Sequence, residues 1–182
     1  MAKEFRGGMW QHYLTLHSIV FGMEAKRVFE FGHGESTESI LSALSPDATL
    51  TTCAMQDPLK LDYPNWTYIQ GDSREALKGF DHPMYDVVLH DGSHTGKVVG
   101  QDLRGIIPFV RKYGLILIHD TQHETLGAEM RKGVRDGLAG RKHTTTTLPY
   151  GYGLTIVRME EGENPVGVTA KKVGHKYGTL PV

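Results

Sequence analysis

Two short apolar segments of this sequence each end in a histidine followed by an aspartate. The two pairs are His90-Asp91 and His119-Asp120. In neighbouring parallel strands equivalent ends lie ~5 Å apart, and two carboxylates that close repel each other unless a proton or a cation lies between them. The repeated ending therefore predicts that Asp91 and Asp120 face one crevice and share a cation. The simpler alternative is that both aspartates only cap the loops and helices that follow them.

The cation expected between these aspartates is a divalent metal ion. Carboxylate oxygens are the ligands that Mg²⁺ prefers, and nearby imidazoles would also suit Mn²⁺, Fe²⁺ or Zn²⁺. Two further histidines stand at matching positions, because His94 lies three residues after Asp91 and His123 lies three residues after Asp120. Both imidazoles are expected to reach the same crevice.

A glycine turn after the apolar stretch 28–31 is the second place where chemistry is expected. Gly32 and Gly34 allow a tight turn and let a ligand touch the backbone where a Cβ would block it. A strand that feeds such a turn and a helix places a ligand crevice at its carboxyl end. Glu30 lies between two phenylalanines, where a buried carboxylate is unfavourable unless it is paired. A cationic ligand group would pair it; the alternative is an ordinary turn between a strand and a helix.

Composition and charge limit the classes to which the protein can belong. The 182 residues suit one domain with a core of its own, and 39% apolar and 23% charged residues are typical of a soluble globular protein. The net charge of −1 argues against a nucleic-acid partner. The chain lacks the long apolar run of a membrane span and the apolar core of a signal peptide, and its one cysteine, Cys53, cannot form an internal disulfide. We therefore expect a cytoplasmic protein.

The elements that position the candidate residues alternate between strands and helices. An amphipathic helix is predicted over 9–23, with a stripe that faces the sheet and consists of Trp10, Leu14, His17 and Phe21, with Tyr13 and Val20 beside them. Strands are expected at 28–32, 48–54, 66–70, 85–89 and 115–118, and a hairpin at 143–148 and 153–159. Helices are expected at 36–44, 74–78, 99–110 and 126–138, and Pro108 is expected to kink or end the third of these. This order predicts an α/β fold, a doubly wound, mostly parallel sheet with helices on both faces. We expect one Rossmann-like domain over 1–159 and an irregular tail over 160–182.

These motifs together resemble those of the class I S-adenosylmethionine-dependent methyltransferases. The similarity is greatest to the small-molecule O-methyltransferases that include metal-dependent sugar and macrolide enzymes and the cephalosporin-hydroxylase-like proteins. Five motifs in order carry it across about residues 28–158: Glu30 to Thr37, Gly71-Asp72-Ser73, Asp86 to His94, Gly114 to Thr121, and Gly153 to Val157. The first motif alone occurs in many nucleotide-binding proteins. The resemblance implies a seven-stranded sheet of order 3-2-1-4-5-7-6 with the seventh strand antiparallel.

The resemblance also implies which residues bind S-adenosylmethionine. Glu30 would hold the amino group of the ligand, the backbone at Gly32 and Gly34 would pass close to its methionine part, and Asp72 with Ser73 would face the adenine. The family usually has an acidic residue for the ribose hydroxyls where Ala54 stands here, so Asp57, or else Gln56, would reach back to replace it. The full set of cofactor-binding candidates is Glu30, Gly32, Gly34, Ser36, Asp57, Asp72, Ser73 and Asp91.

Metal binding and catalysis follow from the same resemblance. Metal-dependent relatives use the aspartate after the fourth strand and an acidic pair after the fifth, which makes Asp91, Asp120 and His119 the metal candidates and Mg²⁺ or Mn²⁺ the expected ion. Transfer of a methyl group to a hydroxyl requires a base, and histidine is the usual base near neutral pH. We expect His94 to be this base, with His119 second and Asp91 completing the catalytic set.

Three functions remain open at this stage. The first is a methyltransferase that acts on a hydroxyl of a small molecule such as a sugar. The second is a non-catalytic or altered-chemistry relative that binds a nucleoside, which Ala54 and the small size of the chain favour. The third is a metal-dependent hydrolase that uses the Asp and His cluster. The expected partner is a small-molecule acceptor, without nucleic acid or membrane, and the tail could reach a second copy in a homo-oligomer.

Overall fold

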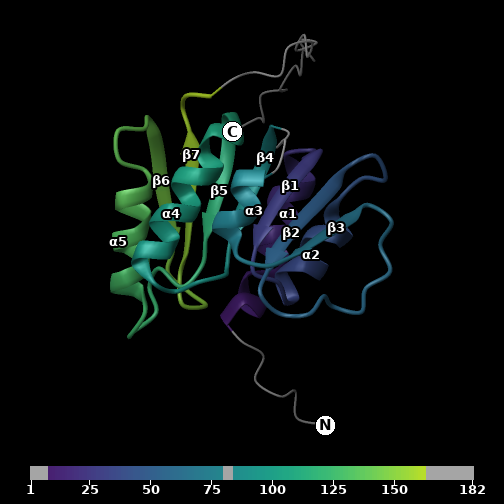
Figure 1. The fold of residues 1–182 in the computed structure, drawn as a ribbon, viewed down its shortest axis with the longest axis horizontal. Coiled ribbons are helices and arrows are strands. Elements are labelled where there is room, and N and C mark those ends of the chain that lie inside the picture. The colour runs from purple at the N-terminus through teal and green to yellow at the C-terminus, as the bar shows by residue number, and fades with distance from the viewer. Residues whose placement is uncertain (1–7, 80–83, 163–182) are drawn as a thin grey trace, which may run out of the picture.

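The computed structural model describes residues 8–79 and 84–162. Seven strands form one sheet in the order β3-β2-β1-β4-β5-β7-β6 (Figure 1). Their bounds are Arg27–Phe31 for β1, Thr49–Ala54 for β2, Trp66–Gln70 for β3, Tyr85–His90 for β4, Val110–Ile118 for β5, His143–Leu148 for β6 and Leu154–Met159 for β7. β7 is antiparallel to β5 and β6, and the other pairs are parallel. The predicted strand order and antiparallel seventh strand are confirmed, while the expected tail lies outside the described residues beyond position 162.

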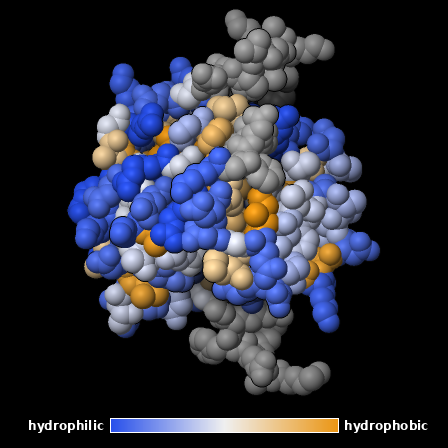
Figure 2. Space-filling model, in the orientation of Figure 1, coloured by the Kyte–Doolittle hydropathy of each residue, from blue (hydrophilic) through white to orange (hydrophobic). Residues whose placement is uncertain are grey.

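Helices cover both faces of the sheet, which confirms the predicted layers. One face carries α1 (Tyr13–Gly22), preceded by a 3₁₀ helix (Gly8–His12), and α2 (Glu35–Ala43). The other face carries α3 (Ser73–Gly79), α4 (Gly96–Ile106) and α5 (Gly127–Gly137). A short 3₁₀ helix (Ile107–Phe109) follows α4, so the helix that we expected over 99–110 ends before Pro108, whose ring does not fit an α-helix interior. The outer surface of the second face is largely hydrophilic (Figure 2).

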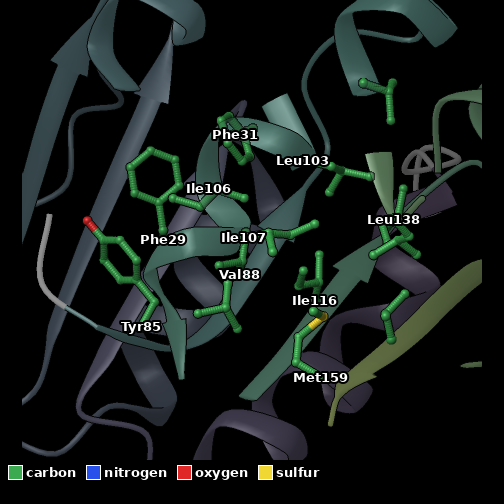
Figure 3. Close-up of a cluster of buried hydrophobic side chains, with 14 of the residues drawn as sticks. Phe29, Phe31, Tyr85, Val88, Leu103, Ile106, Ile107, Ile116, Leu138 and Met159 are labelled. Atoms are coloured by element: carbon green, nitrogen blue, oxygen red, sulfur yellow. The ribbon is translucent and has the colours of Figure 1, made fainter. Parts of the chain in front are cut away.

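The core is divided by the sheet into two layers of apolar side chains. Alternate residues of β1 enter opposite layers, so Val28 packs with α1 and α2 while Phe29 and Phe31 pack on the α4 side (Figure 3). All six residues of β4 are buried. A central strand with helices on both faces of the sheet is buried on both sides. This burial explains the mostly apolar run that the sequence shows there.

The apolar stripe predicted for the first helix faces outward instead of toward the sheet. Leu14 and Phe21 are 76% and 67% exposed, whereas Leu16 and Val20 are buried. This prediction was wrong because apolar residues lie on more than one side of this helix, so a spacing of three and four matches two faces equally well. The α-helix also begins only at Tyr13, after a 3₁₀ segment of different periodicity.

Register brings the loops after β1, β4 and β5 to one edge of the sheet. Phe31 of β1 pairs with His90 of β4, and His90 pairs with Ile118 of β5. The glycine turn and both His-Asp endings therefore meet at the carboxyl edge, where ligands bind in open α/β sheets. None of the helices among the residues described here is long and apolar enough to cross a membrane.

Candidate active site

A cavity of about 430 Å³ lies at the carboxyl edge of β1 to β4. Its lining comes from the carboxyl ends of these strands, from the loops that follow them and from parts of α3 and α4, and includes Gly32, Ala54, Gln56, Ser73 and Asp91. Gly32 has a φ of +82°, and a Cβ at this position would lie 2.2 Å from the carbonyl oxygen of Asp91. The turn therefore requires glycine, because only glycine adopts this φ readily and leaves room for the neighbouring loop.

Glu30 is fully buried beneath this cavity and is not part of its lining. Its carboxylate accepts hydrogen bonds from Ser36 Oγ (2.6 Å), Thr37 Oγ1 (2.8 Å) and Thr52 Oγ1 (2.9 Å). Burial raises the pKa of Glu30 to about 7 despite these three bonds, which lower it. The sequence suggested that a ligand would pair with Glu30. In the structure hydroxyl groups of the protein itself do so, and through them Glu30 connects α2 and β2 to the strand that precedes the glycine turn.

The structure brings only part of the predicted cofactor-binding set to the cavity wall. The members that line the cavity are Gly32, Asp72, Ser73 and Asp91, whereas Glu30, Gly34, Ser36 and Asp57 do not line it. Asp57 is exposed and accepts a hydrogen bond from Gln70 Nε2 (3.0 Å). Met55 and Gln56, which follow Ala54 directly, occupy the wall instead.

Three further residues on the cavity wall were not found from the sequence. Asp102 of α4 accepts a hydrogen bond from Ser73 Oγ (2.7 Å) and one from Nε2 of the buried His90 (3.1 Å). Arg74 forms a bidentate ion pair with Asp72, and these bonds lower the pKa of Asp72 to about 2. Neither ring nitrogen of the third residue, His33, has a hydrogen-bond partner in the described part of the chain. The sequence did not single out Asp102, because a polar residue on an amphipathic helix is usually interpreted as facing solvent.

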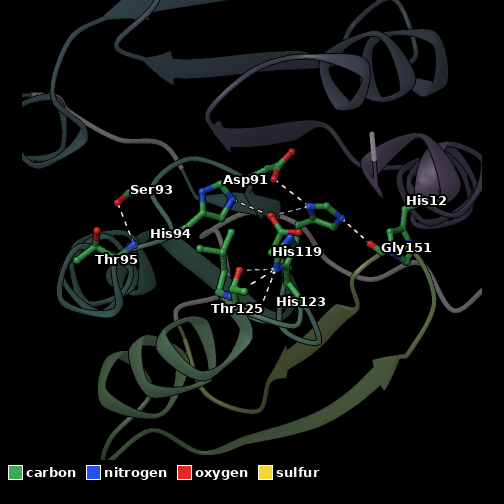
Figure 4. Close-up of polar contacts among 11 residues, drawn as sticks. His12, Asp91, Ser93, His94, Thr95, His119, His123, Thr125 and Gly151 are labelled. Atoms are coloured by element: carbon green, nitrogen blue, oxygen red, sulfur yellow. Dashed lines mark hydrogen bonds and ion pairs between the residues drawn. The ribbon is translucent and has the colours of Figure 1, made fainter. Parts of the chain in front are cut away.

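A second polar group adjoins the cavity through Asp91 (Figure 4). His119 Nδ1 donates to Asp91 Oδ1 (3.0 Å) and lies 3.3 Å from Asp120 Oδ2. His94 Nε2 donates to Asp120 Oδ2 (2.7 Å). The structure thus confirms that the two His-Asp endings meet in one place, as their positions in the sequence predicted.

His119 is the cation between the two aspartates. Its Nδ1 faces carboxylate oxygens and its Nε2 faces the carbonyl oxygen of Gly151 (2.8 Å), so both nitrogens must donate and carry a proton. Burial alone would lower the pKa of His119, but the hydrogen bonds and charges of Asp120 and Asp91 raise it to about 10. A doubly protonated ring that is held on both sides cannot accept a proton, which argues against His119 as the second base.

His94 is the imidazole of this group that remains able to accept a proton. Its Nε2 is held by Asp120, while its Nδ1 has no partner among the residues that the structure describes. The hydrogen bond to Asp120 raises the pKa of His94. His123 does not join the group, since its Nδ1 accepts a hydrogen bond from the backbone nitrogen of Thr125 (3.2 Å) within its own turn.

Asp91, His94 and Asp120 are arranged so that they could hold a metal ion. One ligand atom from each residue lies within 4.8 Å of the others. Two carboxylates and an imidazole suit Mn²⁺ or Zn²⁺, and Mg²⁺ less well because it prefers oxygen ligands. His94 takes the place in this set that the sequence suggested for His119, because the ring of His119 is already held between the aspartates and Gly151.

Comparison with known proteins identifies the family. A family model described as a methyltransferase domain matches residues 29–121, just over half of the chain. The chain belongs to this methyltransferase family. The matched segment runs from β1 to the residue after Asp120, so it contains both the glycine turn and the two His-Asp endings. No curated protein sequence gave a significant match.

Solved structures show that the whole described chain has a methyltransferase fold. A proposed caffeoyl-CoA O-methyltransferase from Staphylococcus aureus is 14% identical with a TM-score of 0.69, and the alignment covers 86% of this chain and 85% of that one. The O-methyltransferase TomG from Streptomyces achromogenes, solved with S-adenosylmethionine, is 18% identical with a TM-score of 0.63 and coverages of 84% and 80%. The MycE methyltransferase of the mycinamycin pathway, solved with Mg and S-adenosylhomocysteine, is 19% identical with a TM-score of 0.58 and coverages of 86% and 51%. This methyltransferase therefore shares its sheet and helices with O-methyltransferases of distant sequence.

Proposed function

We propose that this methyltransferase transfers the methyl group of S-adenosylmethionine to a hydroxyl group of a small molecule. The observation that carries the proposal is the His94–Asp120 pair beside the cavity at the glycine turn. Asp91 joins the two parts, because it lines the cavity and also holds His119. The net charge of −1 supports a small acceptor over a nucleic acid.

The cavity residues fit S-adenosylmethionine in their chemistry. Polar groups for a nucleoside are present at Gln56, Ser73 and Asp102, and the unpartnered ring of His33 needs a hydrogen-bond partner that a ligand can supply. When bound, S-adenosylmethionine would supply an electrophilic methyl group. Gln56 takes the place expected for the missing acidic residue at the end of β2, since its neighbour Asp57 is held by Gln70.

His94 would remove the proton of the acceptor hydroxyl. Asp120 fixes the orientation of the ring through Nε2, so the lone pair of Nδ1 is directed away from Asp120 and toward a substrate. Removal of the proton raises the nucleophilicity of the hydroxyl oxygen, and Asp120 stabilises the imidazolium that results. His119 stays charged and keeps Asp120 and Asp91 in place. Asp91, His94 and Asp120 would alternatively hold a divalent cation; His94 would then be a ligand instead of the base, and the cation would lower the pKa of the acceptor hydroxyl.

The test combines binding and transfer. Calorimetry with S-adenosylmethionine should give saturable binding, and mass spectrometry with a panel of catechols, phenols and sugars should detect a methylated product. His94→Gln should retain the binding and lose the transfer, while the control Lys97→Gln, an exposed residue at the start of α4, should retain both. Binding without transfer over the whole panel would support a nucleoside-binding relative, and absence of binding would contradict the proposal.

A further inference from the structure

A second cavity lies between α5 and the edge strand β6, and it shares no lining residue with the cavity at the glycine turn. Its volume is about 520 Å³. In Figure 1, α5 and β6 form one margin of the molecule. Nothing in the methyl-transfer mechanism uses this groove.

Two parallel rows of side chains form its walls. Arg131, Val134 and Arg135 of α5 line the cavity together with Leu138, the residue directly after the helix, and their spacing places them on one side of it. His143, Thr145 and Thr147 line it from β6, and alternate residues of a strand share a face. The opposite side of α5 is occupied, because Gly133 and Gly137 pack closely against Val99 and Leu103 of α4.

The groove is lined by arginines without a carboxylate. Arg131, Arg135 and Arg141 line it, His143 adds an imidazole, and none of its twelve lining residues is Asp or Glu. The ion pairs of Arg135 with Asp136 (3.7 Å) and of Arg141 with Glu161 (4.0 Å) are long and exposed. Among the described residues no carboxylate lies within ion-pair distance of Arg131, whose Nη1 donates to the carbonyl oxygen of Thr121 (2.6 Å).

Hydroxyl groups occupy the side of the groove formed by the sheet. Thr155 Oγ1 donates to Thr121 Oγ1 (2.8 Å) and lies 2.9 Å from Thr147 Oγ1. Thr145 continues this row along β6 toward His143. A sheet surface beneath a helix usually carries apolar residues, so a row of threonines opposite arginines suits a polar ligand better than it suits packing.

We propose that this groove binds a small organic phosphate monoester. Phosphate oxygens accept hydrogen bonds from guanidinium groups and hydroxyls, and arginine binds phosphate with two parallel bonds. Val134 and Leu138 provide an apolar wall for the organic part of the ligand. The volume exceeds what a phosphate ion needs and lies in the range of small-ligand sites. The site is independent of the proposed methyl transfer.

The test uses phenyl phosphate and inorganic phosphate as probes, with amide chemical shifts and calorimetry as readouts. Phenyl phosphate should bind more tightly than inorganic phosphate and should shift amides of α5 and β6. The double variant Arg135→Gln/Arg141→Gln should weaken binding by about tenfold or more. Both side chains are exposed, so the fold should be retained, which thermal unfolding checks. Lys132→Gln, on α5 but outside the groove, should leave the affinity unchanged.

Three results would overturn the proposal. The first is absence of binding by phenyl phosphate at about 10 mM. The second is an affinity that the double arginine variant leaves unchanged. The third is equal binding of uncharged phenol, which would assign the groove to apolar ligands. If the double variant loses its fold, Thr145→Val decides instead, because loss of that hydroxyl should weaken phosphate binding and leave phenol unaffected.

Discussion

Replacement of Glu30 by glutamine should remove a pH dependence of stability that the buried carboxyl imposes on the fold. The pKa of Glu30 rises from 4.5 to about 7 when the chain folds, because the side chain has no exposed surface. Between these two values the unfolded chain has lost the proton and the folded chain retains it. The free energy of unfolding therefore falls as pH rises through this range and levels off above pH 7.

The size of the effect follows from the shift. Each pKa unit corresponds to 1.36 kcal/mol, so the stability lost between about pH 4.5 and about pH 7 amounts to about 3 kcal/mol. Glu30→Gln keeps the shape of the side chain and carries no charge. The hydroxyls of Ser36, Thr37 and Thr52 can each donate or accept, so they can satisfy an amide as well as a carboxylate.

Urea unfolding of both proteins from about pH 5 to about pH 8 measures the difference in stability directly. The variant should gain stability relative to the natural chain as pH rises, up to about 3 kcal/mol. The difference between the proteins is the quantity to follow, since other titrating groups contribute equally to both. Glu38→Gln, at an exposed position of α2, should show no such trend. Parallel stability curves for the natural chain and Glu30→Gln would refute the reasoning.

Three further predictions concern the site and the helices. The rate of methyl transfer should increase with pH over a range above 6.5, because Asp120 raises the pKa of His94 and the base must be unprotonated. Asp120→Asn should move this rising part of the pH–rate profile to lower pH. A profile that does not move would contradict the role of His94 as the base. His119→Gln should destabilise the protein at neutral pH by about 3 kcal/mol, because it leaves two facing carboxylates without a cation. Thermal unfolding should show that Mn²⁺ restores part of this loss, and insensitivity to Mn²⁺ would count against a metal site. Gly133→Ala should destabilise the protein by about 1–3 kcal/mol in spite of the better helix propensity of alanine, because the new Cβ would lie 2.6 Å from Val99 Cβ. The control is Gly22→Ala, whose new Cβ would have no atom within 4 Å and which should not destabilise the protein.

Local patterns in the sequence were enough for the alternation of strands and helices, and the resemblance to methyltransferases supplied the order of the strands and with it the meeting of the two His-Asp endings. Strand β4 is rich in apolar residues because both its faces are buried, and such a run leaves few alternatives to a central strand. Because β1, β4 and β5 are parallel neighbours, their carboxyl ends must meet at one edge of the sheet. Gly32 has a φ of +82°, and a Cβ at this position would clash with the loop at Asp91. The presence of glycine at this position was therefore enough to indicate the turn.

The side of a helix that faces the core, and the partner of each polar group, were decided only by the tertiary structure. The first helix has apolar residues on several sides, and only its packing against β1 and α2 selects Leu16 and Val20 over Leu14 and Phe21. Glu30 could have paired with a ligand, but folding brings three hydroxyls from α2 and β2 to it first. The protonated ring of His119 is held by its sequence neighbour Asp120 and also by Asp91 and Gly151, which lie 28 and 32 residues away in the sequence. Hydrogen bonds and charges act over a few ångströms of space, so residues far apart in the chain determine protonation, and spacing along the sequence does not record them.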